Sequence, residues 1–156
     1  MAATGLPARG RRVPVTERYP VAGYAADYAD AFAVDAAGAP PVPLEDLFRT
    51  TLDGWPARPL VGFAHRRLLR FQLAPRRSPE HVHGWRIVTA EPDVVVLRAL
   101  SPWMSGHLVG RRSGGEIVLT TFLRWARPGL PRLVWALVGP AHRRVTPHLL
   151  ARCVRG

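Results

Sequence analysis

The chain has 156 residues, of which 47% are apolar, and a mean hydropathy near zero, so it has the make-up of one packed domain and not of a disordered chain. Its single cysteine excludes an internal disulfide and a cysteine-rich zinc site. The net charge is +11, all 22 basic residues are arginine, and no apolar run approaches the roughly 20 residues of a membrane span.

The positive charge is concentrated after residue 60. Residues 1–60 hold six arginines and seven acidic residues, whereas residues 61–156 hold sixteen arginines and four acidic residues. Such an excess can attract anions, nucleic acid or acidic lipid. Because no block of five basic residues occurs, we favour arginine side chains that are solvated on several faces.

The N-terminal residues 1–18 are small, basic and interrupted by proline and glycine, which predicts a flexible basic arm. Arg11-Arg12 is followed by residues 13–17, which are not a hydrophobic segment. We therefore expect no signal peptide and a cytoplasmic location. Residues 19–156 are expected to form a single domain.

The first half of this domain predicts one strand and two helices. The strand is expected around Ala31–Asp35. Helical spacing starts at Pro43 and stops at Asp53-Gly54, and a second helix is predicted from about Pro56 to Leu73, followed by a loop over residues 74–84. The first helix has one apolar stripe, formed by Leu44, Leu47, Phe48 and Leu52.

From Trp85 the apolar period changes to two, which predicts four antiparallel strands. Turns are expected at Glu91-Pro92-Asp93 and Ser113-Gly114-Gly115. The strands are read from "WRIVT", "DVVVLRAL", "HLVGR" and "EIVLTTFLRWA". In the last strand the odd-numbered residues are predicted to face inward, namely Ile117, Leu119, Thr121, Leu123 and Trp125.

After Arg127–Pro131 helical spacing returns and lasts to the end of the chain. The predicted order is a strand, two helices, an antiparallel meander and one long C-terminal helix. Strands and helices segregated in this way indicate an α+β fold, with the helices on one side of a curved antiparallel sheet.

Three stretches of the chain resemble the helix-grip superfamily (START-like, polyketide-cyclase-like, SRPBCC), and within it a bacterial family known only as a domain of unknown function. They are "DYADAFAV", "SPEHVHGWRIV" and "LTTFLRWARPGLPRLVWALVGPAHRRVTPHLLARC". In that family the last stretch runs from a strand ending in Thr-Thr to a helix with a Pro-x-His-Arg step, here Thr120-Thr121 and residues 140–143. The residue before the histidine is often aromatic in the family, whereas here it is Ala141.

The resemblance covers roughly residues 24–154 and implies a sheet wrapped around the C-terminal helix. It also implies a cavity between them that in relatives often holds an apolar small molecule, but it implies no particular reaction. Tryptophan and methionine side chains suit such a cavity, although core packing explains them equally well. The expected ligand-binding residues are Trp103, Met104, His107, Leu123, Trp125, Trp135 and His142.

Two histidines among these residues are candidates for a polar anchor. His142 falls inside the narrow apolar stripe of the C-terminal helix, together with Ala141 and Val145, whereas Arg143 falls outside it. His107 begins a strand, where it could face the mouth of a cavity, although we favour an exposed histidine at the strand end. His142 is the stronger candidate.

Metal and cysteine chemistry are not expected. His81-x-His83 has the spacing of two ligands on one strand face, but the pair lies in a loop with only Glu80 beside it. Cys153 does not share a helix face with His148, so we expect it to be a buried apolar residue. We therefore expect no metal, no cofactor and no catalytic residue.

Three functions are compatible with these observations. The first is a binding protein for an apolar or aromatic small molecule, and the sequence favours it over an enzyme. The second is an arginine-rich protein that binds nucleic acid or an acidic partner, based on Arg66–Phe71, Arg111-Arg112 and Arg143-Arg144. The third is a cyclase-like or hydrolase-like enzyme that uses His107 or His142.

Overall fold

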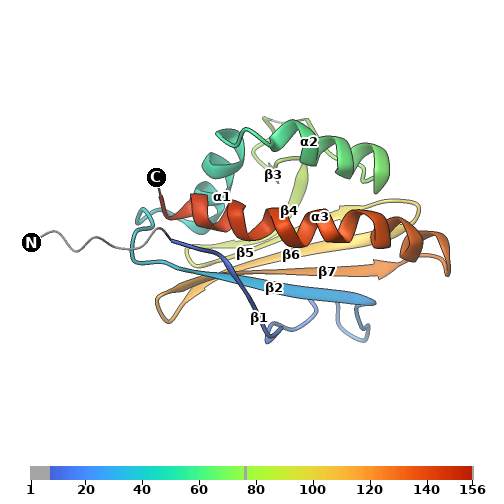
Figure 1. The fold of residues 1–156 in the computed structure, drawn as a ribbon, viewed down its shortest axis with the longest axis horizontal. Helices are drawn as coiled ribbons and strands as arrows, with labels where there is room; N and C mark the ends of the chain where they lie inside the picture. Colours follow the sequence, from blue (N-terminus) through green and yellow to red (C-terminus); the bar gives the residue numbers. More distant parts are fainter. Residues whose placement is uncertain (1–7, 76, 156) are drawn as a thin grey trace, which may run out of the picture.

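The computed structural model of the chain describes residues 8–75 and 77–155. Its strands form one antiparallel sheet in the order β1-β2-β7-β6-β5-β4-β3. The helices lie on one side of this curved sheet, and the C-terminal helix runs along it, as Figure 1 shows. The α+β fold with a sheet that grips a long C-terminal helix is therefore confirmed.

The strands are β1 Arg11–Val13, β2 Tyr28–Asp35, β3 His81–Val82, β4 Trp85–Glu91, β5 Val94–Leu100, β6 Met104–Ser113 and β7 Glu116–Trp125. The helices are α1 Leu44–Asp53, α2 Arg58–Phe63, the π-helical turn η1 Ala64–Leu68, and α3 Leu130–Cys153. Both predicted hairpin turns of the meander are present. In the second, Gly114 and Gly115 adopt φ angles of 59° and 79°, which few other residues tolerate.

The N-terminal arm differs from the expectation. Its residues 11–13 form β1, which pairs with β2, and Arg11 forms an ion pair with Glu116. The unpaired backbone groups at the edge of β2 explain why this short segment adds a strand. Residues 1–7 of the expected arm lie outside the described residues.

The second helix is shorter than predicted. It ends at η1, and Arg70 then adopts a φ of 55°. The side chains on either side of Arg70, Leu69 and Phe71, are both buried, so the chain leaves the helix in order to bury them. The following loop contains β3, which turns into β4 through His83 and Gly84 with φ angles of 50° and 86°.

The register of the sheet decides which side chains face the helices. Thr121 on β7 is opposite Asp30 on β2 and opposite Leu108 on β6, so these three side chains share one face. The odd-numbered residues of β7 lie on this face, as predicted, and Ile117 and Leu123 are among the most buried residues of the chain.

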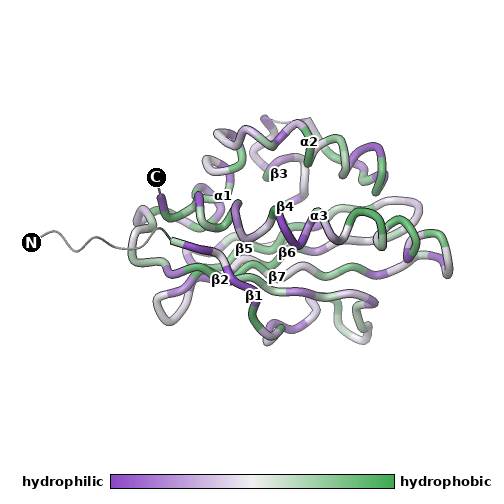
Figure 2. The backbone as a smooth tube through the Cα atoms, in the orientation of Figure 1, coloured by the Kyte–Doolittle hydropathy of each residue, from purple (hydrophilic) through white to green (hydrophobic). Residues whose placement is uncertain are grey.

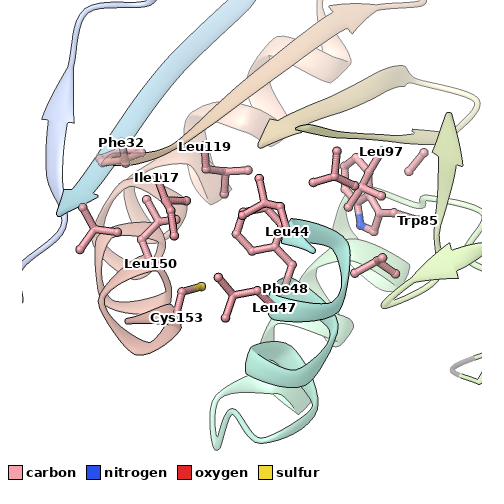
Figure 3. Close-up of a cluster of buried hydrophobic side chains, with 14 of the residues drawn as sticks. Phe32, Leu44, Leu47, Phe48, Trp85, Leu97, Ile117, Leu119, Leu150 and Cys153 are labelled. Carbon is pink, nitrogen blue, oxygen red and sulfur yellow. The ribbon is translucent and has the colours of Figure 1, made fainter. Parts of the chain in front are cut away.

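The main core lies where α3 packs on β2 and β7 and α1 packs on α3 and on β4, β5 and β6. Figure 3 shows Leu44, Phe48 and Ile117 converging in this region. In Figure 2 the central strands are largely green, whereas the edge strand β1 is largely purple. Cys153 lies in the same core, as predicted, and burial raises the pKa of its thiol to about 11, so it remains protonated and packs as an apolar side chain.

Gly110 on β6 makes room for this core. A Cβ atom at this position would overlap the ring of Phe48 and lie 3.0 Å from Cγ1 of Val95. We therefore expect Gly110→Ala to lower the free energy of unfolding by about 1–3 kcal/mol, as overpacking does. Urea denaturation measures this loss.

The matched control is Gly62→Ala in α2, where a Cβ atom would have no atom of the described structure within 4 Å. Alanine has the higher helix propensity, so we expect this variant to be as stable as the parent or more stable. Equal stability of the two variants would contradict the role of Gly110.

Candidate functional site

A cavity of about 180 Å³ lies between the inner face of the sheet and the helices. Leu97, Leu108 and Leu119 line it from three neighbouring strands, and Leu60 and Val61 line it from α2. The stripe of α3 that faces it consists of Trp135, Val138, Ala141, His142, Val145, Thr146 and Leu149. Three of the residues predicted to bind ligand, Leu123, Trp135 and His142, therefore lie on one cavity.

One end of the cavity is aromatic. Phe71 and Trp85 pack with ring centroids 5.1 Å apart, and His65 lies 5.5 Å from Trp85. Burial lowers the pKa of His65 to about 3, so its ring is neutral at neutral pH. Its Nδ1 then accepts a hydrogen bond from Nε1 of Trp85 at 3.4 Å.

The opposite side of the cavity is polar. Nε2 of His142 lies 3.0 Å from Oδ2 of Asp30, whose side chain is fully buried. The same carboxylate accepts a hydrogen bond of 2.5 Å from the hydroxyl of Tyr28. The ring of Trp135 covers the group, with its centroid 5.2 Å from His142 and 4.9 Å from Tyr28.

The charge of Asp30 is stabilised within the protein. Burial raises the pKa of Asp30, but its hydrogen bond and charge interaction with His142, together with the bond from Tyr28, outweigh burial and place the pKa below 3.8. Burial and the same carboxylate raise the pKa of Tyr28, so its hydroxyl keeps the proton that it donates. An ionised carboxylate thus orients the imidazole ring of His142, which itself lines the cavity.

Two further polar atoms on the cavity lining are buried without a hydrogen-bond partner among the described residues. They are Oγ1 of Thr121 and Nε1 of Trp135. Thr146 on α3 is different, because its hydroxyl donates to the backbone oxygen of His142 at 2.8 Å. We call this region the polar corner; it consists of Tyr28, Asp30, Thr121, Trp135, His142 and Thr146. It combines groups whose hydrogen bonds are satisfied with hydrogen-bonding capacity that the described residues do not use.

Three of the other residues predicted to bind ligand lie elsewhere on the molecule. Met104 is buried but is not part of the cavity lining. Trp103 lies under the guanidinium of Arg70, 5.5 Å from the ring centroid. Trp125 borders an open hollow at the start of α3, beside Asp27.

His107 lies on the opposite face of the sheet from the cavity. It pairs with Phe122, an even-numbered residue of β7, and the ring of Tyr19 covers it at 5.5 Å. The segment before β2 thus buries a histidine that the sequence placed near a cavity mouth. The structure does not bring His107 to the cavity side of the sheet.

The burial of His107 predicts a pH dependence of stability. Burial lowers its pKa from 6.5 to about 4, so between these values the unfolded chain binds a proton that the folded protein does not. Titration of His107 therefore does not affect the free energy of unfolding well above pH 6.5. The free energy of unfolding decreases as the pH falls towards 4, with a slope of at most about 1.4 kcal/mol per pH unit.

Replacing His107 by leucine is expected to flatten this loss. Urea denaturation of both proteins at several pH values between 7 and 4.5 measures it. If the two proteins lost stability in parallel, His107 would not be the buried group responsible.

Asp30, the carboxylate that contacts His142, is not among the residues predicted from the sequence. It reaches His142 across 112 positions of the chain. The available signal was an acidic residue directly before the predicted strand Ala31–Asp35, flanked by Ala29 and Ala31 and on the same face as Phe32. Only the packing of α3 on β2 identifies its partner.

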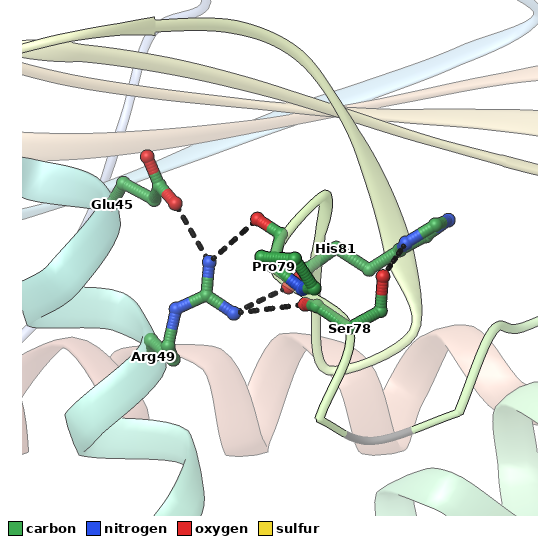
Figure 4. Close-up of polar contacts among 5 residues, drawn as sticks. All are labelled: Glu45, Arg49, Ser78, Pro79 and His81. Carbon is green, nitrogen blue, oxygen red and sulfur yellow. Dashed lines mark hydrogen bonds and ion pairs between the residues drawn. The ribbon is translucent and has the colours of Figure 1, made fainter.

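The loop that carries His83, the third histidine of the cavity lining after His65 and His142, is fixed by Arg49. The guanidinium of Arg49 donates to the backbone oxygen of His81 at 2.6 Å and pairs with Glu45 at 2.7 Å (Figure 4). His81 itself contacts Oγ of Ser78 at 2.7 Å. His81 and His83 do not share a strand face, because His83 turns the chain with its positive φ while lining the cavity.

The arginine pairs behind the nucleic-acid alternative are partly engaged within the protein. Arg111 pairs with Glu17, and Arg112 pairs with Asp93. Arg143 donates to the hydroxyl of Tyr28 at 3.4 Å. Phe71, the aromatic residue beside the basic segment of η1, is buried and is not exposed for stacking.

The comparisons with known proteins give no relative: no family model, no curated protein and no solved structure matches the chain. Within residues 8–75 and 77–155, no helix has the length and apolar character needed to cross a bilayer. The geometry of the cavity therefore carries the functional interpretation.

Proposed function

We propose that the protein binds a small, mainly apolar molecule in the cavity between the sheet and α3. The observation that carries this proposal is the cavity itself, which has leucines on three strands, an aromatic end and one polar corner. Ligand sites combine apolar walls with a few placed polar groups in the same way. The helix-grip resemblance supports the same function, because such relatives often bind apolar molecules at this place.

The volume of the cavity limits the size of the ligand. Apolar cavities of about 150 Å³ can hold benzene, whereas drug-sized ligands occupy roughly 300–1,000 Å³. A cavity of about 180 Å³ matches one six-membered ring with a small substituent. We therefore infer a single-ring or similarly small ligand.

Thermal unfolding in the presence of single-ring compounds tests the proposal. A ligand at one hundred times its dissociation constant stabilises the folded state by about 2.7 kcal/mol, which raises the Tm by several degrees. Trp85 and Trp135 line the cavity, so the intrinsic fluorescence should change over the same concentration range.

A cavity-filling variant makes the test specific. Val145 lies on the cavity lining, so we expect Val145→Phe to abolish the ligand-induced shift while the free protein still folds. The matched control is Val88→Phe, because Val88 on β4 is exposed and outside the lining. If Val145→Phe kept the full shift, the cavity would not be the binding site.

A further inference from the structure

The hydroxyl of Thr121 lacks the hydrogen bond that a buried polar group normally has. Thr121 is 3% exposed, and its Oγ1 has no partner among the described residues. A buried polar group without a partner costs about 1–3 kcal/mol, so a polar atom left in this condition calls for an explanation. Because Thr121 lines the cavity, a bound molecule can supply the missing bond.

Thr121 and His142 are neighbours through Asp30. Thr121 is directly opposite Asp30 in the ladder between β2 and β7, which places their Cβ atoms about 5 Å apart on one face. His142 approaches the same carboxylate from α3 with its Nε2. All three groups thus meet at the polar corner of the cavity.

The second ring nitrogen of His142 also has hydrogen-bonding capacity to spare. Its Nδ1 has one long contact, at 3.4 Å, with Oγ1 of Thr146. That hydroxyl donates its proton to the backbone oxygen of His142. Nδ1 of His142 and Oγ1 of Thr121 are therefore two groups of this corner, besides Nε1 of Trp135, that a ligand can engage.

We propose that Thr121 and His142 bind a hydroxyl group of the ligand, so that the cavity selects a neutral hydroxylated ring such as a phenol. This inference rests on the proposed function. A hydroxyl both donates and accepts, so it can satisfy Thr121 and either protonation state of the His142 ring. A plain hydrocarbon leaves Thr121 without a partner, and a carboxylate brings a second negative charge next to the buried Asp30.

Titration calorimetry with toluene, phenol and benzoate tests the selection, because the three probes share a ring and differ in one substituent. One additional hydrogen bond of typical strength makes phenol bind roughly three- to tenfold more tightly than toluene. Benzoate is expected to bind more weakly than phenol.

The decisive variant is Thr121→Val, which keeps the shape and removes the hydroxyl. Removing an unpaired buried hydroxyl does not weaken folding, so the variant should fold. It is expected to bind toluene at least as tightly as the parent and to lose the preference for phenol. The matched control is Thr120→Val, because Thr120 is equally buried on β7 but faces away from the cavity. This control should keep the preference.

The outcomes separate the two proposals. Equal binding of toluene and phenol by the parent, tighter binding of benzoate, or a phenol preference that survives in Thr121→Val would each overturn the hydroxyl site. All three leave the apolar cavity intact as a ligand site. Failure of all three compounds to bind, together with no shift from any single-ring compound, would overturn the proposed function and the hydroxyl site with it.

Discussion

Asp30→Ala is expected to lower the free energy of unfolding by about 3–5 kcal/mol, because it removes two contacts to a buried, ionised carboxylate, and each hydrogen bond to a charged group contributes about 1.5–3 kcal/mol. The side chain of Asp30 is fully buried and contacts both His142 and Tyr28. Chemical denaturation at pH 7 measures the loss. Asp35→Ala is the matched control on the same strand, because Asp35 is exposed and accepts a hydrogen bond from the backbone N–H of Ala37 nearby.

The same pair predicts how stability depends on pH at the acidic end. The pKa of Asp30 in the folded protein lies below its ordinary value of 3.8, so its contribution is complete well above pH 3.8 and is lost as the pH falls through the lower folded value. Asp30→Asn removes this titration and should flatten the loss of stability below pH 4. A variant that lost stability as steeply as the parent in this range would show that Asp30 is not ionised in the folded protein.

Leu123→Ala is expected to cost about 2–5 kcal/mol and to enlarge the cavity at the same time. Leu123 is 2% exposed and lies both in the core and on the cavity lining. We expect the variant to bind a two-ring compound such as naphthalene that the parent cannot accommodate. Urea denaturation measures the cost, and the Tm shift with naphthalene measures the change in capacity.

Ile117→Ala separates these two effects. Ile117 lies on the same face of β7 and is as deeply buried, but it is not part of the lining. We expect a similar loss of stability and no new binding of naphthalene. Binding of naphthalene by both variants would attribute the effect to general loosening of the core and not to the cavity.

The fold class and the arrangement of the meander follow from the pattern of apolar residues and turns along the chain. Apolar residues alternate with a period of two along β7 and with a helical period along α1, and these periods follow directly from backbone geometry. The same reasoning identified the inner face of β7 and the cavity stripe of α3, including His142. Glycine pairs such as Gly114-Gly115 marked a turn because few other residues adopt a positive φ there.

Local patterns failed where a long-range contact competes with them. The chain leaves the second helix early because Leu69 and Phe71 are buried on either side of Arg70, and helical spacing alone does not contain that information. Residues 11–13 became a strand because β2 offered a free edge. His107 was expected to face the cavity, but it lies on the other face of the sheet, where Tyr19 covers it.

The chemistry of the cavity depends on contacts between distant parts of the chain. Asp30, Thr121 and His142 come from β2, β7 and α3, and they meet because strand register and helix packing bring distant parts of the chain together. A sequence shows which side of its own strand or helix a residue occupies, since that depends on backbone period. It does not show which residue lies opposite, because that depends on how the elements pack in three dimensions.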